Sequence, residues 1–253
     1  MDLTRDNYYT REANEAYWSA SFVKEMLDCP ARALAELREE WERPSSTALL
    51  VGSYVDAHFE GRLPEFVAAH PEIINSRTGA LKADYLATDK MIARAEADPV
   101  FMDYMTGDKQ VIKTGAIGGI PFKCKMDVYM AGVRIVDLKT VKDFEPLYRP
   151  GEGRLHYADF WRWPLQMAIY QAIEGNRLPC YLAVISKQDP PDIDLIEIPQ
   201  DVLDMEIKLL KDKLPYFDAM RSGVIEPERC GKCAYCRQTH KLTGPTIFNV
   251  MEE

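Results

Sequence analysis

The spacing of hydrophobic residues changes period along the chain, and each change predicts a different kind of secondary structure. From residue 19 to about 105, apolar side chains recur every three or four positions, as in helices that bury one face. From about 108 to 141 the pattern becomes short β-like runs separated by glycines, which predicts a three-stranded antiparallel meander. The segments that follow are a helix at 159–175, an apolar strand at 179–186, an alternating strand at 192–198 and an amphipathic helix at 201–220.

Four segments before the meander are predicted to be helical, and the last of them, which begins with "DPVFMDYM" at 98–105, is short. Ser19 can cap the first helix, because a serine side chain accepts a hydrogen bond from the first turn. A second helix is expected from Ser46 to about Phe59, with its apolar residues on one stripe. A third, from Lys82 to Ala97, carries mixed charges, and we expect it to be exposed to solvent.

The size and charge of the chain narrow the classes of function. Its 253 residues are enough for a large domain with its own core. The net charge of −9 argues against a general nucleic-acid coat, which is usually basic, but not against an enzyme that meets phosphates through metal ions. No apolar run approaches the roughly 20 residues of a membrane helix, and the N-terminus does not resemble a signal peptide. We therefore expect a cytoplasmic protein that does not contact a membrane.

A pair of charged residues interrupts the apolar strand "VRIVDLKT". Asp137 and Lys139 share one face of this strand, because side chains alternate along it. Asp127, on the preceding strand, reaches the same face only if the turn near Gly132 has an odd number of residues or contains a bulge. The sequence therefore predicts such a turn if these residues form one site.

Carboxylates beside a lysine suit phosphodiester hydrolysis. Carboxylate oxygens bind Mg²⁺ or Mn²⁺, the metal activates water, and a lysine stabilises developing charge. The alternative is a surface salt bridge, since Asp-x-Lys is a common triplet. Two helical pairs one turn apart favour a site: Gln166 with Tyr170, and Gly52 with Asp56.

Together these motifs resemble the PD-(D/E)xK nuclease superfamily, and within it the RecB-like branch. The resemblance spans residues 19–245 and is strongest to phage and prophage nucleases of the exonuclease VIII (RecE-like) type. It implies an α+β, restriction-endonuclease-like fold, with a mixed central sheet and an αβββαβ core flanked by helices. The residues that carry it are Asp127, "DLK" at 137–139 and "QMAIY" at 166–170.

The resemblance assigns roles to these residues. Asp127 and Asp137 would bind the metal, Lys139 would be the catalytic lysine, and Gln166 and Tyr170 would contact DNA or brace the lysine.

Asp56 stands where many RecB-like nucleases carry a metal-binding histidine. An aspartate can also bind Mg²⁺, so we expect Asp56 to be the third metal ligand. His58 lies about 200° further around the helix and is expected to be an ordinary helix residue.

Three clustered cysteines, Cys230, Cys233 and Cys236, predict a second metal site, since this spacing occurs in both iron–sulfur and zinc proteins. By resemblance to RecB-type nucleases with a [4Fe–4S] cluster, Cys29 would be the fourth ligand. We expect a [4Fe–4S] cluster, with zinc as the alternative and His240 as a substitute zinc ligand. Such a site would join both ends of a single domain spanning residues 1–253, with its core at about 45–198.

Basic residues after the meander are candidates for DNA binding, although acidic residues interrupt them. They are Lys142, Arg149, Arg154 and Arg162.

The expected function is a Mg²⁺- or Mn²⁺-dependent exodeoxyribonuclease that acts on duplex DNA ends in phage recombination. By the resemblance, it would supply a single-strand annealing protein and form a ring of subunits. The alternatives are a nuclease of the CRISPR-adaptation type and a non-catalytic, metal-stapled DNA-binding or assembly module.

Overall fold

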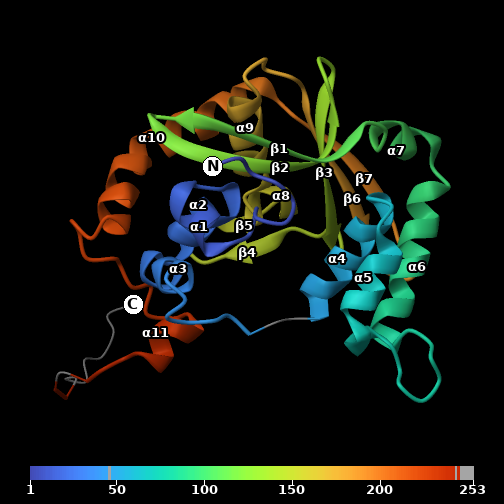
Figure 1. The fold of residues 1–253 in the computed structure, drawn as a ribbon, viewed down its shortest axis with the longest axis horizontal. Coiled ribbons are helices and arrows are strands. Elements are labelled where there is room, and N and C mark those ends of the chain that lie inside the picture. Colours follow the sequence, from blue (N-terminus) through green and yellow to red (C-terminus); the bar gives the residue numbers. More distant parts are fainter. Residues whose placement is uncertain (45–46, 243, 246–253) are drawn as a thin grey trace.

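The computed structural model describes residues 1–44, 47–242 and 244–245, and its centre is a five-stranded mixed sheet (Figure 1). The predicted helix start at Ser46 lies outside the described residues. The sheet order is β1-β2-β3-β6-β7, and only the β3–β6 pair is parallel. The strands are β1 (Asp108–Ile117), β2 (Ile120–Met130), β3 (Arg134–Val141), β6 (Cys180–Ser186) and β7 (Ile193–Ile198). The predicted meander and the α+β class with a mixed sheet are confirmed.

Helices cover both faces of this sheet, and each face has its own hydrophobic core. The first core lies under α2 (Ala20–Asp28), α3 (Pro30–Leu37), α8 (Tyr157–Phe160), α9 (Trp163–Glu174) and α10 (Gln200–Arg221), and α1 (Arg11–Ala16) packs against α3. The second lies under α4 (Thr47–Phe59), α5 (Leu63–Ala69), the 3₁₀ turn Pro71–Ile73, α6 (Ala83–Glu96) and α7 (Pro99–Tyr104). The cores are separated by the sheet, so a strand residue's position in the alternation decides which group of helices it meets.

The parallel β3–β6 pair requires a crossover, which α9 provides by packing on the sheet. The helix predicted at 159–175 is interrupted, because Arg162 adopts the left-handed conformation (φ 53°) between α8 and α9. Pro164 then occupies the first turn of α9, where proline is tolerated, and Gly175 ends the helix with φ 90°.

The β2–β3 turn contains three residues, 131–133, because Met130 pairs with Arg134. Gly132 adopts φ 73°, and the Val133 amide donates to the Met130 carbonyl at 2.9 Å. The predicted odd-length turn is thus confirmed. The β2–β3 pairing ends at Val128–Val136, and the same register continued by one residue would bring Asp127 opposite Asp137.

The helix expected at 82–97 is present as α6, but it is not a solvated helix. Tyr85, Met91, Ile92 and Ala95 are buried in the second core, where α6 packs against α4. The interspersed charges hid this buried face.

Short elements were not predicted, because they contain too few residues to show a period. They include the β4 (Leu147–Arg149) and β5 (Gly153–Leu155) hairpin and α11 (Ala234–Gln238). Among the described helices, none combines the length and apolar character needed to cross a membrane.

Candidate active site and metal centre

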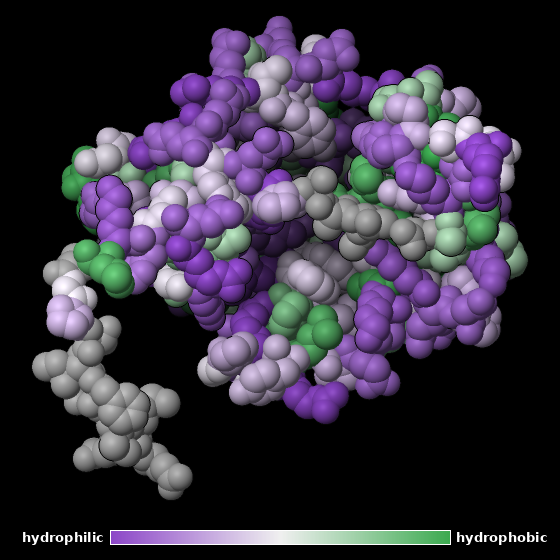
Figure 2. Space-filling view, turned by 90° about the horizontal axis from the view of Figure 1, so that it is seen from below, coloured by the Kyte–Doolittle hydropathy of each residue, from purple (hydrophilic) through white to green (hydrophobic). Residues whose placement is uncertain are grey.

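A cavity of about 590 Å³ opens where α2, α4 and α9 approach strands β2 and β3. Seen from below, the molecule is hollowed near its centre, and hydrophilic side chains surround the hollow (Figure 2). The predicted site residues that line the cavity are Asp56, Asp127, Asp137, Lys139, Gln166 and Tyr170. The structure therefore brings together residues from four separate elements.

Asp127 lies where the regular alternation of β2 side chains between the two cores is interrupted. Met126 belongs to the first core and Val128 to the second, although residues two apart share a face of a regular strand. Opposite this point, Gln110 adopts the left-handed conformation (φ 53°), which is uncommon for a residue other than glycine. The Gln110 amide donates to Asp127 Oδ1 at 3.1 Å, and the Leu138 backbone amide donates to Oδ2 at 2.9 Å. Both oxygens of Asp127 are thus held.

Asp137 is almost completely buried, with 1% of its surface exposed. Its Oδ1 accepts a hydrogen bond from Gln166 Nε2 at 3.0 Å. Its Oδ2 forms an ion pair with the Lys139 ammonium but has no hydrogen-bond partner among the described residues. A buried carboxylate oxygen that lacks a hydrogen bond is available to a cation.

Gln166 is at the centre of a hydrogen-bonded chain behind these carboxylates. Its Nε2 also donates to the Tyr170 hydroxyl at 3.1 Å, one turn along α9. Its Oε1 accepts from Lys24 Nζ at 2.7 Å. Lys24, on α2, and Gln110 were not identified from the sequence, since neither belongs to a motif and both reach the site through contacts distant in the chain.

Asp56 reaches the cavity because α4 approaches β3 closely at Gly52. A Cβ atom on Gly52 would lie 3.4 Å from Thr140 Oγ1, which is van der Waals contact, so the two elements are closely packed at this point. His58 instead bonds Glu96 through Nε2 at 2.8 Å. It does not line the cavity, in agreement with its interpretation as an ordinary helix residue.

The cavity concentrates negative charge that water does not fully solvate. Burial, and then the neighbouring Asp137, raise the pKa of Asp56 to about 7, although Lys139 opposes this. Burial and the charges of Asp137 and Asp56 raise the pKa of Asp127 well above its usual value. Burial alone would lower the pKa of Lys139, but Asp137 and Asp127 outweigh it and raise the pKa.

This arrangement fits a divalent cation, which would neutralise the repulsion among the carboxylates and share Asp137 with Lys139. The oxygens of the three carboxylates lie further apart than the ligands of a bound ion would. Within the described ranges, the only group of at least three acidic, histidine or cysteine ligand atoms lying within 4.8 Å of one another is the cysteine cluster. Lys139 holds Asp137, and hydrogen bonds hold both oxygens of Asp127, so binding of a cation would have to bring the three carboxylates closer together.

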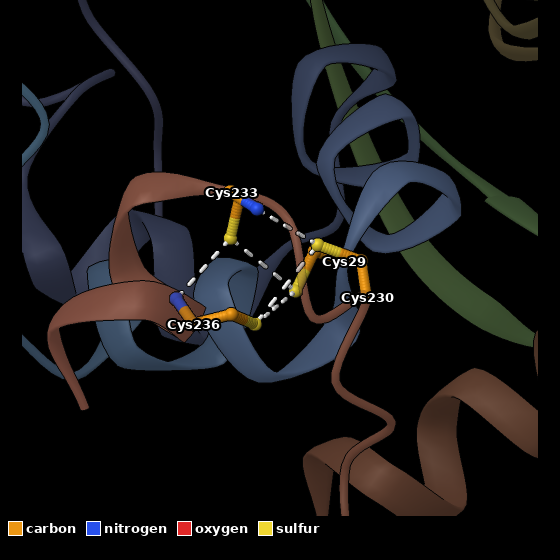
Figure 3. Close-up of side chains that lie close together, drawn as sticks. All are labelled: Cys29, Cys230, Cys233 and Cys236. Atoms are coloured by element: carbon orange, nitrogen blue, oxygen red, sulfur yellow. Dashed lines mark hydrogen bonds between the residues drawn. The ribbon is translucent and has the colours of Figure 1, made fainter. Parts of the chain in front are cut away.

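The second site unites four cysteines from opposite ends of the chain (Figure 3). Cys29 lies between α2 and α3. Cys230 lies in the loop before α11, Cys233 caps that helix and Cys236 lies within it. Their sulfur atoms all lie within 4.8 Å of one another, so the predicted fourth ligand is in place. His240 is exposed and does not belong to the group. Four converging thiols are the donor set of a structural metal site.

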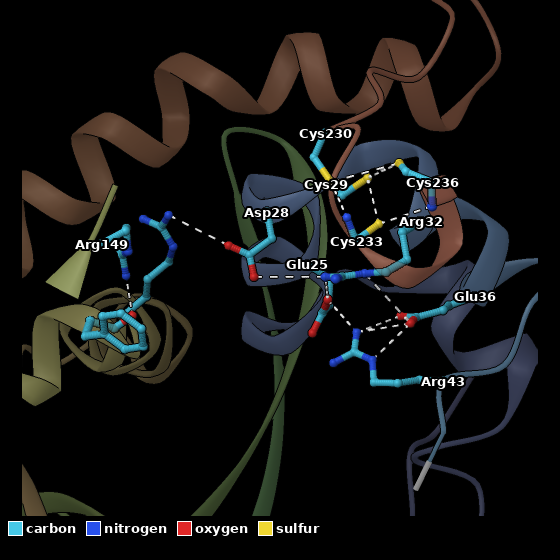
Figure 4. A network of polar contacts seen from close by, with 12 residues as sticks. Glu25, Asp28, Cys29, Arg32, Glu36, Arg43, Arg149, Cys230, Cys233 and Cys236 are labelled. Atoms are coloured by element: carbon cyan, nitrogen blue, oxygen red, sulfur yellow. Dashed lines mark hydrogen bonds and ion pairs between the residues drawn. The ribbon is translucent and has the colours of Figure 1, made fainter. Parts of the chain in front are cut away.

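A network of ion pairs lies beside the cysteine cluster (Figure 4). Arg32 pairs with Glu25, and Arg43 bridges Glu25 at 2.6 Å and Glu36 at 3.0 Å. Glu25 and Glu36 also line the cavity. The α2–α3 region is therefore shared by the active-site wall and the cysteine cluster.

The basic residues predicted to bind DNA do not line the cavity. Arg149 and Arg162 line a separate pocket, and Lys142 is exposed and paired with Asp143 at 3.4 Å. The lysines of the cavity wall are Lys123, Lys125 and Lys139. DNA binding by Lys142, Arg149, Arg154 and Arg162 stays a prediction.

Comparison with known proteins identifies the class to which this fold and site belong. The family model "PDDEXK-like domain of unknown function (DUF3799)" matches residues 19–239, and the chain belongs to this PDDEXK-like family. The chain is also similar to one particular protein, the "Putative exonuclease" from Eubacterium rectale. The two are 38% identical, with a TM-score of 0.93 over 98% of this chain and 97% of that crystal structure.

The chain is only weakly similar to the crystal structure of SSO0001, with 13% identity over 73% of this chain and 84% of that one and a TM-score of 0.28. Among curated proteins, no match is found.

Proposed function

We propose that the protein is a Mg²⁺-dependent exonuclease that hydrolyses phosphodiester bonds at duplex DNA ends. The observation that carries this proposal is the buried Asp137–Lys139 ion pair beside Asp127, in the wall of a large cavity. The PDDEXK-like family and the similar protein described as an exonuclease support it.

Each group of residues in the site has a separate role in the reaction. Asp56, Asp127 and Asp137 would hold the metal, which when bound polarises the phosphate and acidifies water. Lys139 keeps its proton, since its pKa is raised, and places a positive charge where the phosphate accumulates negative charge. Gln166 and Tyr170 orient Asp137 from behind.

Cleavage of end-labelled linear duplex DNA tests this function, with closed circular DNA as the substrate that lacks ends. We expect Mg²⁺-dependent digestion of the linear DNA alone. Lys139→Ala and Asp137→Ala should each reduce the rate by at least roughly 10²-fold, because each removes a charge from the reacting centre. Lys90→Ala, which removes an exposed lysine paired with Asp189, is the matched control.

Undiminished cleavage in both variants would show that another site, or a contaminant, is responsible. Binding without cleavage, indifferent to Mg²⁺, would instead favour the non-catalytic DNA-binding module. A role in phage recombination, a single-strand annealing partner and a ring of subunits stay predictions from the resemblance.

For the four-cysteine centre we propose a single Zn²⁺ ion in place of the [4Fe–4S] cluster expected from the sequence. Cys29 Sγ lies 3.6 Å from Cys236 Sγ and 3.9 Å from Cys233 Sγ, and the Cys230–Cys236 separation is also 3.9 Å. Tetrahedral Zn–S bonds of about 2.3 Å require sulfurs about 3.8 Å apart. In a [4Fe–4S] cluster each thiolate binds a different iron, so the whole cluster would have to fit between these sulfurs, and such spacings leave no room for it.

Metal analysis tests the zinc proposal. The protein is purified anaerobically from cells supplied with both zinc and iron. We expect a colourless protein with one zinc per chain, and loss of that zinc in Cys29→Ser. Cys180→Ala is the matched control, because Cys180 is a buried core cysteine outside the cluster. Brown protein containing about four irons, or four free thiols without metal, would overturn the assignment.

A further inference from the structure

Lys24, on α2, has an uncommon environment: it is a partly buried lysine without a carboxylate partner. Among the described residues it forms no ion pair within 4.0 Å, and its ammonium donates to the side-chain oxygen of Gln166 at 2.7 Å. Burial, and then the charge of Lys139, lower the pKa of Lys24 to about 8. Burying a cation on a neutral partner costs free energy, and such costs are concentrated at functional sites.

The position of Lys24 follows from how α2 is fixed. Ser19 caps the helix by accepting a hydrogen bond from the Phe22 amide at 3.2 Å. Val23 and Met26 are buried in the first core, and Cys29 ends the helix in the metal centre. With both ends and one face of α2 held, Lys24 is directed at Gln166 on α9.

The contact determines which way the Gln166 amide faces. A lysine ammonium can only donate, so the amide oxygen must face Lys24 and the NH₂ group must face the other way. That NH₂ group donates to Asp137 Oδ1 at 3.0 Å and to the Tyr170 hydroxyl at 3.1 Å. In the flipped amide, an oxygen would face the Asp137 carboxylate, and two acceptors would repel each other.

Asp137 in turn depends on this orientation. Because Gln166 engages Oδ1, the other oxygen, Oδ2, is the one turned to Lys139 and free of hydrogen bonds among the described residues. This is the oxygen that the proposed function gives to the metal. Partners that orient metal-binding side chains change metal affinity or activity by roughly 10–100-fold when they are removed.

We propose that Lys24 is a positioning residue, whose ammonium fixes the Gln166 amide and through it the Asp137 carboxylate. This inference rests on the proposed function, since it gives Asp137 a metal to bind. It assigns Lys24 no direct contact with DNA, in agreement with its absence from the residues that line the cavity.

A double-mutant cycle between Lys24→Met and Gln166→Ala tests the proposal, with Mn²⁺ affinity measured by calorimetry in the absence of DNA. Lys24→Met should weaken Mn²⁺ binding by roughly 10-fold or more, whereas Lys24→Arg, which keeps the donor, should restore most of the affinity. In the Gln166→Ala background, Lys24→Met should have almost no further effect, because its route to Asp137 is already lost. Lys90→Met is the control for loss of a lysine charge.

Additive effects of the two substitutions would overturn the proposal, since Lys24 would then act without Gln166. Unchanged Mn²⁺ affinity in Lys24→Met, with weaker DNA binding, would identify Lys24 as a phosphate contact instead. Thermal melting of each variant identifies any loss of fold. If the wild type binds Mn²⁺ but cleaves no DNA, the proposed function fails while the cycle still tests Lys24.

Discussion

At the scale of single residues, hydrogen-bond chemistry explains more of the site than proximity does. Asp127 has both oxygens satisfied, whereas Asp137 has one satisfied and one facing Lys139. Two aspartates that look equivalent in the sequence are therefore expected to respond differently to substitution. The sequence could identify both, but not Gln110 or Lys24, whose partners lie at least 17 positions away along the chain.

Lys123 offers a test of how the N-terminal segment is held. It is 1% exposed, and its ammonium donates to the Tyr8 carbonyl at 2.5 Å and to Asn14 Oδ1 at 2.7 Å. Burial lowers the pKa of Lys123 from 10.5 to about 8. Below pH 8 both the folded and unfolded chains carry the proton, so the full cost of burying the charge is present. Between pH 8 and 10.5 only the unfolded chain retains it, so the contribution of Lys123 to stability rises with pH.

We therefore expect the free energy of unfolding of the wild type to rise, relative to Lys123→Met, by about 1–2 kcal/mol between about pH 7.5 and 9.5. Denaturant titrations of both proteins at the two pH values measure this difference. A difference that stays constant with pH would mean that Lys123 titrates normally in the folded protein.

At the scale of elements, the β2–β3 turn determines whether a site exists at all. Its three residues place Asp127 opposite Asp137, and a one-residue change of register moves every side chain of a strand to the other face. The alternation of residues predicted this turn, because a two-residue turn would separate the aspartates. The break at Arg162 was not predicted, since hydrophobic spacing continues through it and only the backbone shows the left-handed residue.

Deleting Val133, an exposed turn residue, should abolish nuclease activity, because it leaves a two-residue turn with Asp127 and Asp137 on opposite faces. Gly132→Asn, which keeps the length and tolerates the positive φ, should retain most of the activity. Cleavage assays beside circular dichroism separate loss of the site from loss of the sheet. Full activity in the deletion variant would refute the dependence on register.

At the scale of the whole molecule, the cysteine centre joins the beginning of the chain to its end beside the wall of the cavity. The sequence predicted all four members of the cysteine cluster, because three are close together in the chain and the resemblance supplied Cys29. It could not distinguish zinc from iron–sulfur, since the same residue types serve both and only the sulfur separations differ. The buried face of α6 was not predicted, because charged residues are interspersed along it and its partner α4 is distant in the chain.

Removing the metal from the four-cysteine centre should lower the thermal stability of the protein. We expect a strong chelator to lower the melting temperature of the wild type by several degrees, because a structural metal contributes directly to folding. Cys29→Ser should melt at a similarly reduced temperature and be insensitive to the chelator, whereas Cys180→Ala should respond as the wild type does. Identical melting of wild type with and without chelator, after confirmed metal loss, would show that the centre does not stabilise the fold.

The most direct test of the proposed metal site is anomalous diffraction from crystals soaked in Mn²⁺. We expect a peak in the cavity, bound by the carboxylates of Asp56, Asp127 and Asp137. That peak should be lost in Asp137→Ala. Absence of any peak between these carboxylates at saturating Mn²⁺, in crystals with an open cavity, would contradict the assignment of the site.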